Sequence, residues 1–237
     1  MKRAILSFYD VAMDTHVVEY QQKVLEKFNI GAEYSGPKSA DYYPLLSQKT
    51  EEEILHYQGL DYGVGKLFDD GYDTVLILDT DCIPLNSYAL DYIFSQAEKD
   101  ILIGNAQRSM HIENDEHMYI GSSCLCLSKN LYEKFGRRTF APDHIKADTC
   151  EYYSYDAEAH GVPIEIFMPK SYIRDDLGGK WNLGKGRGSY GIGTTFVNSL
   201  GVEMFFHLFS SRQKVYNTYF YDKCDEILNT SIGLSKV

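Results

Sequence analysis

The sequence predicts an α/β domain with a mostly parallel central sheet, and three observations favour this class. Apolar, strand-like runs alternate with helical patterns from residue 4 to residue 209, which is typical of a sheet covered by helices. The run 74–78 is apolar almost throughout, as expected for a central strand that is buried on both faces. No linker or low-complexity tract divides the 237 residues, so we expect a single domain over 1–237.

The N-terminal part of the chain is expected to form a strand, a helix and a second strand. Residues 4–8 are a short apolar run that predicts the first strand. A helix capped at Asp14 follows, and residues 32–35 predict the second strand. The capping box at 50–53 predicts the start of a further helix, which we expect to end near Asp70.

The rest of the chain continues the alternation of strands and helices. Helices are expected at 87–98, 128–135 and 148–160, and strands at 74–78, 100–104, 118–127, 163–168, 194–198 and 202–209. The tyrosine-rich segment after Gln213 shows no clear pattern.

Glycine is concentrated in one expected helix and in one expected loop. Gly59, Gly63 and Gly65 each cost the helix about 1 kcal/mol, so they indicate either the close approach of a neighbour or tolerated defects. Seven of the sixteen residues at 178–193 are glycine, which predicts a mobile lid or, alternatively, a surface loop. The P-loop-like string in this segment has Gly186 where Ser or Thr is required.

Composition disfavours some partners and suggests a compartment. Lys plus Arg total 23 and Asp plus Glu total 34, so the net charge is −11, which disfavours a surface built to coat nucleic acid or anionic lipid. The five cysteines are an odd number without a regular framework, which predicts reduced thiols and a cytoplasmic location. No run approaches about 18 apolar residues, so we expect no stable membrane insertion.

Two carboxylates follow the 74–78 strand directly. Asp79 and Asp81 flank Thr80 at the carboxyl end of the strand, which is where an open parallel sheet binds its ligands. Two carboxylates this close repel each other, and a bound divalent cation would relieve that repulsion. Oxygen ligands suit Mg²⁺ or Mn²⁺, and either ion can hold a diphosphate. Alternatively, Asp79 caps the following turn and Asp81 is merely solvated.

The segment around this pair resembles a known family. Val75-Leu76-Ile77-Leu78-Asp79-Thr80-Asp81-Cys82-Ile83-Pro84 is similar to the D-x-D strand of nucleotide-sugar glycosyltransferases of the GT-A fold. The resemblance covers about residues 1–212 and is closest to the retaining galactosyltransferase and glycogenin-like branch. It implies a GT-A-like domain with a Rossmann-like sheet. Residues 1–100 would form the nucleotide-binding half, residues 101–212 the acceptor half, and residues 213–237 a C-terminal tail.

The resemblance implies a reaction and a metal. Such an enzyme moves a sugar from a nucleoside-diphosphate sugar, by the family's habit a UDP-sugar, to an acceptor hydroxyl. Many members have a histidine near the C-terminus as a third metal ligand, and His207 lies 207 − 81 = 126 residues after Asp81. With Asp79, Asp81 and His207 as ligands, Mn²⁺ would be preferred over Mg²⁺ because of the imidazole. Alternatively, His207 is a hydrogen-bonded core residue among its aromatic neighbours.

The resemblance also implies donor-binding and catalytic residues. The donor-binding residues would be Phe8, Tyr9, Asp10, Thr80, Lys180, Trp181, Lys185, Arg187 and Arg212. The catalytic residues would be Asp81, which is also a metal ligand, and Asp148, which resembles the carboxylate-bearing position that faces the anomeric carbon in retaining members. An inverting enzyme would need a carboxylate base instead, for which Asp143, Asp148, Glu151 and Asp156 are candidates. The acceptor could be a saccharide, a protein, a lipid head group or modified DNA.

Two other functions remain open from the sequence. A phosphatase of the haloacid dehalogenase type would use Asp79 as nucleophile and Asp81 as acid, with Lys170 and the acidic pair at 175–176 in support. Its D-x-D normally follows the first strand, however, and here a strand–helix–strand pattern comes first. The third function is non-catalytic binding of a sugar nucleotide. His111 and His117 bracket acidic residues, which we interpret as a solvated loop rather than a second metal site.

Overall fold

The structure is a computed structural model, and it describes residues 1–8, 15–28, 56–110, 112–143, 145–173, 180–209, 211 and 213–230. Statements about structure concern these residues. The strand expected at 32–35, the helix start at 50–53 and the cap at Asp14 lie outside them.

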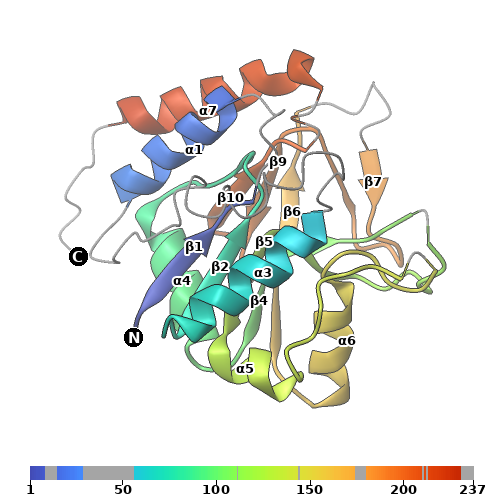
Figure 1. Cartoon of the computed structure of the whole chain (residues 1–237). Helices are drawn as coiled ribbons and strands as arrows, with labels where there is room; N and C mark the ends of the chain where they lie inside the picture. Colours follow the sequence, from blue (N-terminus) through green and yellow to red (C-terminus); the bar gives the residue numbers. More distant parts are fainter. Residues whose placement is uncertain are drawn as a thin grey trace, which may run out of the picture.

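An eight-stranded sheet forms the centre of the molecule (Figure 1). In spatial order its strands are β1 (Arg3–Leu6), β2 (Thr74–Leu78), β5 (Tyr119–Ser128), β4 (Leu102–Gln107), β6 (Ile164–Ser171), β9 (Thr194–Val197), β10 (Glu203–His207) and β3 (Cys82–Pro84). A separate two-stranded hairpin consists of β7 (Lys180–Asn182) and β8 (Ser189–Gly191).

The sheet is mixed, although most of its strands share one direction. β1 with β2 and β4 with β6 are parallel pairs, and the other neighbours are antiparallel. It follows that β1, β2, β4, β6 and β10 run one way and that β3, β5 and β9 run the other way. The α/β class is confirmed. The parallel pairs are fewer than expected because strands of opposite direction lie between those that share one.

Six helices surround the sheet in the described residues. They are α1 (Thr15–Phe28), α3 (His56–Asp69), α4 (Ser87–Ala97), α5 (Lys129–Lys134), α6 (Glu151–Ala159) and α7 (Asn217–Asn229), with a short 3₁₀ turn at Lys214–Tyr216. In Figure 1, α3, α5 and α6 cover the face of the sheet toward the viewer and α4 lies behind it. The helices expected at 87–98, 128–135 and 148–160 match α4, α5 and α6 within a few residues.

The strand β2 is buried on both faces, as its sequence predicts. Val75 and Ile77 belong to the core beneath α3, α5 and α6, whereas Leu76 and Leu78 belong to the core beneath α4. This division follows from the alternation of side chains along a strand. Because all five residues of β2 are buried, the turn that follows it is anchored rigidly.

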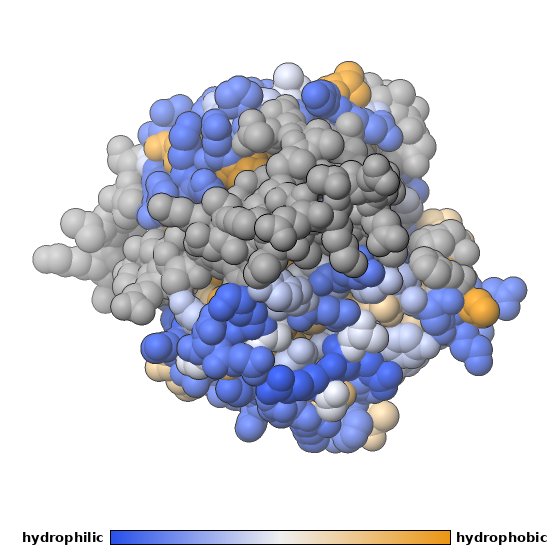
Figure 2. Space-filling view, in the orientation of Figure 1, coloured by the Kyte–Doolittle hydropathy of each residue, from blue (hydrophilic) through white to orange (hydrophobic). Residues whose placement is uncertain are grey.

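The two helices α1 and α7 pack side by side along one edge (Figure 1). Val17 and Val24 of α1 share a third core with Phe220 and Cys224 of α7. No pattern was expected after Gln213, but residues 214–229 of this segment form the 3₁₀ turn and α7, whose apolar residues recur at helical spacing. No helix in the described part of the chain is long and apolar enough to cross a membrane. The described surface in Figure 2 is mainly hydrophilic.

Two of the three helix glycines allow a close approach. A Cβ on Gly59 would overlap the Phe8 ring, and a Cβ on Gly63 would lie 2.8 Å from Leu6 Cδ2. Gly65 has no such neighbour, because the nearest atom is 3.4 Å away. The first two glycines therefore let α3 lie directly on the carboxyl end of β1, beside the turn after β2.

Candidate functional site

Strand pairing brings two carboxylates and an imidazole together. Asp79 and Asp81 lie in the short turn between β2 and β3. β10 runs antiparallel to β3, in a register that places His207 opposite Cys82. His207 therefore lies beside the turn, although it is 126 residues from Asp81 in the chain.

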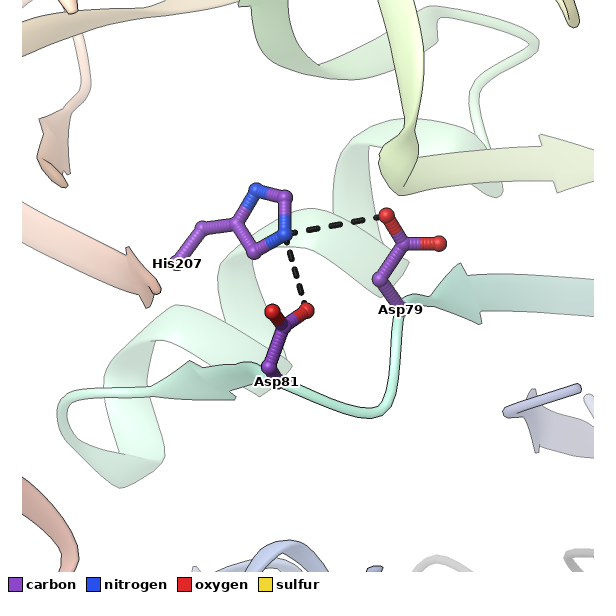
Figure 3. A group of neighbouring side chains, drawn as sticks. All are labelled: Asp79, Asp81 and His207. Atoms are coloured by element: carbon purple, nitrogen blue, oxygen red, sulfur yellow. Dashed lines mark hydrogen bonds and ion pairs between the residues drawn. The ribbon is translucent and has the colours of Figure 1, made fainter. Parts of the chain in front are cut away.

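The three side chains converge on a small volume (Figure 3). His207 Nε2 lies 3.0 Å from Asp81 Oδ1 and 3.6 Å from Asp79 Oδ2. Their potential ligand atoms all lie within 4.8 Å of one another. The side chains of His207 and Asp81 are 4% and 7% exposed and that of Asp79 is 28% exposed, so the cluster is open to solvent on the side of Asp79.

The cluster favours an ionised Asp81. Burial alone would raise the pKa of this carboxyl group, but the charge of His207 and hydrogen bonds from His207 and Ser211 outweigh burial and lower the pKa. The Ser211 backbone N–H donates to Asp81 Oδ2 at 3.2 Å.

The residues fit a divalent cation. His207 directs Nε2 between the two carboxylates, while its buried Nδ1 has no hydrogen-bond partner among the described residues. Two carboxylates and one imidazole form a donor set that suits Mn²⁺ or Mg²⁺. The group therefore can bind a divalent metal, and the preference for Mn²⁺ stays a prediction.

A buried glutamine supports the turn from below. Gln21 of α1 is 1% exposed, and its Nε2 donates to the carbonyls of Asp79 at 2.7 Å and Cys82 at 2.8 Å. The Cys82 N–H closes the turn by donating to Asp79 O at 2.9 Å. Sequence reasoning missed Gln21, although a polar side chain in the apolar stripe of a helix, between Val17 and Val24, is a usable signal.

Asp148 is held in place by hydrogen bonds. Its Oδ2 accepts hydrogen bonds from the Ser109 hydroxyl and, at 3.0 Å, from the buried Tyr119 hydroxyl, while its Oδ1 accepts from the Thr149 N–H at 2.7 Å. Burial, and then the charge of Asp148, raises the pKa of Tyr119 well above its usual value, so this phenol remains a donor.

Cys150 directly precedes α6 and is 1% exposed. Burial, followed by the charges of Asp79 and Asp148, raises the pKa of its thiol. The catalytic role of Asp148 stays a prediction.

The other three candidate bases have structural partners. Asp143 Oδ1 accepts the backbone N–H groups of residues 145–147, and Asp143 Oδ2 accepts the Tyr152 hydroxyl. Asp156 forms a two-pronged ion pair with Arg138 at 2.8 and 2.9 Å. Both oxygens of the fully buried Glu151 accept hydrogen bonds from within the protein.

The glycine-rich segment is partly ordered as the hairpin β7–β8. Trp181 stacks on Tyr190, with ring centroids 5.5 Å apart, and lies 5.4 Å from Phe209. The Phe209 ring in turn lies 3.7 Å from His207. The hairpin therefore reaches the metal-ligand cluster through aromatic contacts, and its role as a lid stays a prediction.

The three cations of this segment contact residues outside the metal-ligand cluster. The Lys185 N–H and the Arg187 guanidinium donate to Glu116, at 3.0 and 2.7 Å. Both residues line a pocket of about 370 Å³ together with His117 and Glu158. Lys180 lies over the Tyr172 ring at 5.7 Å. Contact of these three cations with a diphosphate stays a prediction.

Of the remaining donor residues, the structure describes Thr80, which lies in the turn, and Phe8, which follows β1. Thr80 is 3% exposed, and Phe8 packs against the core beneath α3. Tyr9, Asp10 and Arg212 lie outside the described residues.

His56 was not expected at the site. It is the first residue of α3, and its Nε2 lies 3.5 Å from Asp79 Oδ1. No local sequence pattern predicts this contact, because it depends on how α3 packs against β1 and β2.

Comparisons with known proteins give similarities of fold at low identity. No protein-family model and no curated protein matches this sequence. Similar solved structures include a protein of Desulfovibrio desulfuricans G20 described as a nucleotide-diphospho-sugar transferase, at 11% identity and a TM-score of 0.42, covering 70% of this chain and 80% of that one.

Two further structures cover most of the chain. One is 4-diphosphocytidyl-2C-methyl-D-erythritolsynthase from Anaerococcus prevotii DSM 20548, at 11% identity and a TM-score of 0.44, covering 93% of this chain and 96% of that one. The other is HddC from Yersinia pseudotuberculosis complexed with GMP-PN, at 13% identity and a TM-score of 0.38, covering 95% and 99%. With TM-scores below 0.5, these similarities leave the functional assignment to the side chains of the site.

Proposed function

We propose that the chain is a metal-dependent glycosyltransferase. It would move a sugar from a nucleoside-diphosphate sugar, with a UDP-sugar as the first candidate, to a hydroxyl of an acceptor that is still to be identified. The observation that carries the proposal is the convergence of Asp79, Asp81 and His207 at the end of a buried strand. Such a position at a carboxyl strand end is typical of ligand sites in α/β sheets.

Some side chains would bind the metal, and others would orient those ligands. Asp79 and Asp81 would each give an oxygen and His207 a nitrogen to the metal. When bound, a divalent cation neutralises the negative charge that develops on a departing nucleoside diphosphate. The exposure of Asp79 supports access for a diphosphate from solvent. Gln21 would keep the turn rigid, so that the ligands are oriented before the donor binds.

We propose Asp148 as the carboxylate that faces the sugar, because the family resemblance implies this role for it. Ser109, Tyr119 and the Thr149 N–H hold it by hydrogen bonds, as other partners hold Asp143, Asp156 and Glu151. A fixed carboxylate can stabilise positive charge at the anomeric carbon in a retaining reaction or accept a proton from an acceptor in an inverting one. We favour the retaining reaction, as the family resemblance implies.

Calorimetric titration and product analysis test the proposal together. A panel of nucleoside diphosphates and nucleotide sugars is titrated into the protein with Mn²⁺ and again with EDTA. We expect metal-dependent binding of one nucleotide, followed by release of the nucleoside diphosphate from its sugar. The Asp79→Asn variant should lose both, whereas Asp70→Asn, a matched control at an exposed carboxylate paired with Lys66, should retain both.

The products also separate the alternatives. Formation of a nucleoside triphosphate from the nucleotide sugar and pyrophosphate would show nucleotidyl transfer and overturn glycosyl transfer. Trapping of a phosphoryl-group mimic on Asp79, without nucleotide binding, would indicate the phosphatase. The Lys170 ammonium that a phosphatase would need is paired with Glu203 at 2.8 Å, which weighs against that reaction. Nucleotide binding without any turnover would indicate a non-catalytic binder.

A further inference from the structure

Two imidazoles face the two oxygens of Asp79. His207 Nε2 faces its Oδ2 at 3.6 Å, and His56 Nε2 faces its Oδ1 at 3.5 Å. The second separation is an ion-pair distance, longer than the usual range of about 2.7–3.2 Å for an N–H···O hydrogen bond. Within the described residues, Asp79 Oδ1 has no closer side-chain partner than His56. One carboxylate oxygen therefore faces the metal-ligand cluster, and the other faces His56.

The packing of α3 and of the Phe8 ring determines the position of His56. It begins α3, whose Leu60 and Val64 are fully buried against the sheet. Its ring lies 6.1 Å from the Phe8 ring, which itself occupies the space left open by Gly59. The His56 side chain is 32% exposed. A histidine in this position is held near Asp79 and still has one side open to solvent.

We propose that His56 is a positioning residue for the metal ligand Asp79. Its Nε2–H directs Oδ1 away from the cluster and leaves Oδ2 for the cation, a role that rests on the proposed metal-dependent function. Carboxylates that bind metals are commonly oriented in this way by a hydrogen bond to the oxygen outside the coordination sphere. His56 thus contributes to the site without being a metal ligand.

The proposal has a consequence for metal selectivity. A carboxylate whose second oxygen is held elsewhere offers one oxygen to the cation. Without His56, both oxygens of Asp79 are available, and two-oxygen binding suits the larger Ca²⁺ better than Mg²⁺ or Mn²⁺. We therefore expect His56 to discriminate against Ca²⁺ as well as to strengthen Mn²⁺ binding.

Metal titration by calorimetry, with no nucleotide present, tests the proposal. Mn²⁺ alone and Ca²⁺ alone are titrated into the full-length wild type and into His56→Ala, His56→Asn and His56→Gln. Removal of an orienting residue of this kind typically costs 10- to 100-fold in metal affinity, so we expect at least about a tenfold weaker Mn²⁺ affinity in the Ala and Asn variants. Ca²⁺ affinity should fall less, so the ratio of the two affinities should shrink.

The Gln variant provides the rescue. The Nε2–H of glutamine can occupy a place close to that of the histidine Nε2, whereas the shorter Asn cannot reach Asp79. Most of the Mn²⁺ affinity should therefore return in His56→Gln. His160→Ala is the matched control, because His160 is exposed at the end of α6 and its Nδ1 contacts only its own helix, at Asp156 O.

The outcomes distinguish this inference from the proposed function. Unchanged Mn²⁺ and Ca²⁺ affinities in both short variants would overturn the role of His56 while leaving the metal site intact. An equal loss of both affinities without rescue by Gln would also overturn it, because that result indicates general disruption. Absence of Mn²⁺ binding in the wild type, as in Asp79→Asn, would overturn the metal site itself. A thermal unfolding scan of each variant confirms that the protein titrated is folded.

Discussion

Two regions of the molecule combine carboxylates with a histidine, yet they differ in what they can bind. The metal-ligand cluster contains Asp79, Asp81 and His207. The second region, here called the buried acid–histidine pair, contains Glu151 and His117, whose Oε1 and Nδ1 are 2.8 Å apart. By composition alone, either region could hold a cation.

The difference lies in the number of unused lone pairs. Glu151 is completely buried, and its oxygens accept hydrogen bonds from Asn114, from His117 and from the Asp148 N–H. The second nitrogen of His117 faces Glu158 at 3.3 Å, and the ring stacks on Tyr155 at 4.0 Å. This region is saturated by the protein.

The metal-ligand cluster is not saturated. His207 Nε2 lies between two carboxylates, and Asp79 is partly exposed. A carboxylate–histidine group is therefore a candidate ligand site only where its acceptor atoms are not already engaged in hydrogen bonds within the protein. The comparison of the two regions also corrects the interpretation of His117 as part of a solvated loop, because the ring is packed against α6 and paired with it.

The largest expected difference between the two regions concerns metal binding. Mn²⁺ at about 100 times its dissociation constant should stabilise the wild type by about 2.7 kcal/mol and raise its Tm. We expect Asp79→Asn to abolish that Tm shift and the turnover, while Glu151→Gln keeps the shift. Thermal unfolding with Mn²⁺ and with EDTA measures this. A full shift in Asp79→Asn would remove the distinction between the regions.

The same comparison predicts the reverse order for stability. Glu151→Ala leaves the buried Asn114 and the half-buried His117 without their acceptor, and breaking a buried pair costs about 3–5 kcal/mol. Asp79 is partly exposed, and its buried neighbour His207 keeps Asp81 as a partner. Asp79→Ala should therefore change the free energy of unfolding much less. Urea unfolding of the two variants in EDTA gives both values, and equal losses would contradict the prediction.

A third prediction connects the core to the metal-ligand cluster. Gln21→Leu removes two hydrogen bonds to the turn at Asp79 and Cys82, which should cost about 1–3 kcal/mol of stability. We also expect about tenfold weaker Mn²⁺ binding, because the ligands lose their support. Gln96→Leu, on α4, is the matched control for the loss of an amide. A destabilised Gln21→Leu protein with unchanged Mn²⁺ affinity would show that the turn keeps its shape without Gln21.

The smallest expected effect is a dependence of stability on pH. Burial lowers the pKa of His117, but its hydrogen bonds and charge contacts with Glu151 and Glu158 outweigh burial and raise the pKa above its usual value. Because the pKa of His117 is raised in the folded protein, its pairing with the two glutamates stabilises the folded state fully below about pH 6.5, the pKa of an unfolded histidine. This contribution to stability is lost as pH rises through the pKa of the folded state.

Replacement of His117 tests that sign. We expect the difference in unfolding free energy between the wild type and His117→Gln to shrink as pH rises from 5 to 9. The contribution of Asp81 to stability has the opposite pH dependence. Because the pKa of Asp81 is lowered in the folded protein, its contribution is lost as pH falls through that pKa, in the acid range. A difference that stays constant or grows with pH would show that His117 is neutral in the folded protein.

Much of the fold and part of the site could be predicted from the sequence. The apolar run of β2, the D-x-D pair after it and the bounds of α4 and α6 depend on residues close together in the chain, so local patterns are sufficient to predict them. The helix α7 was not predicted, although Phe220 and Cys224 recur at helical spacing, because Tyr216, Tyr219 and Tyr221 obscure the apolar stripe.

Strand direction shows where local patterns cease to be sufficient. The sequence predicts a mostly parallel sheet, yet β5 pairs antiparallel with both of its neighbours, β2 and β4. Parallel neighbours need a crossover of about a dozen residues or more, usually a helix. Which strands become neighbours depends on the whole chain, so the mixture of directions emerges only in the tertiary structure.

The position of Asp79 and Asp81 at the end of a buried strand could be predicted from the sequence, because the apolar run and the two carboxylates are consecutive residues. The distant side chains that lie beside them depend on the tertiary structure. The register of β10 on β3 brings in His207, the packing of α1 brings in Gln21, and the fit of α3 over β1 brings in His56. These contacts depend on the pairing and packing of elements far apart in the chain, which no local pattern specifies.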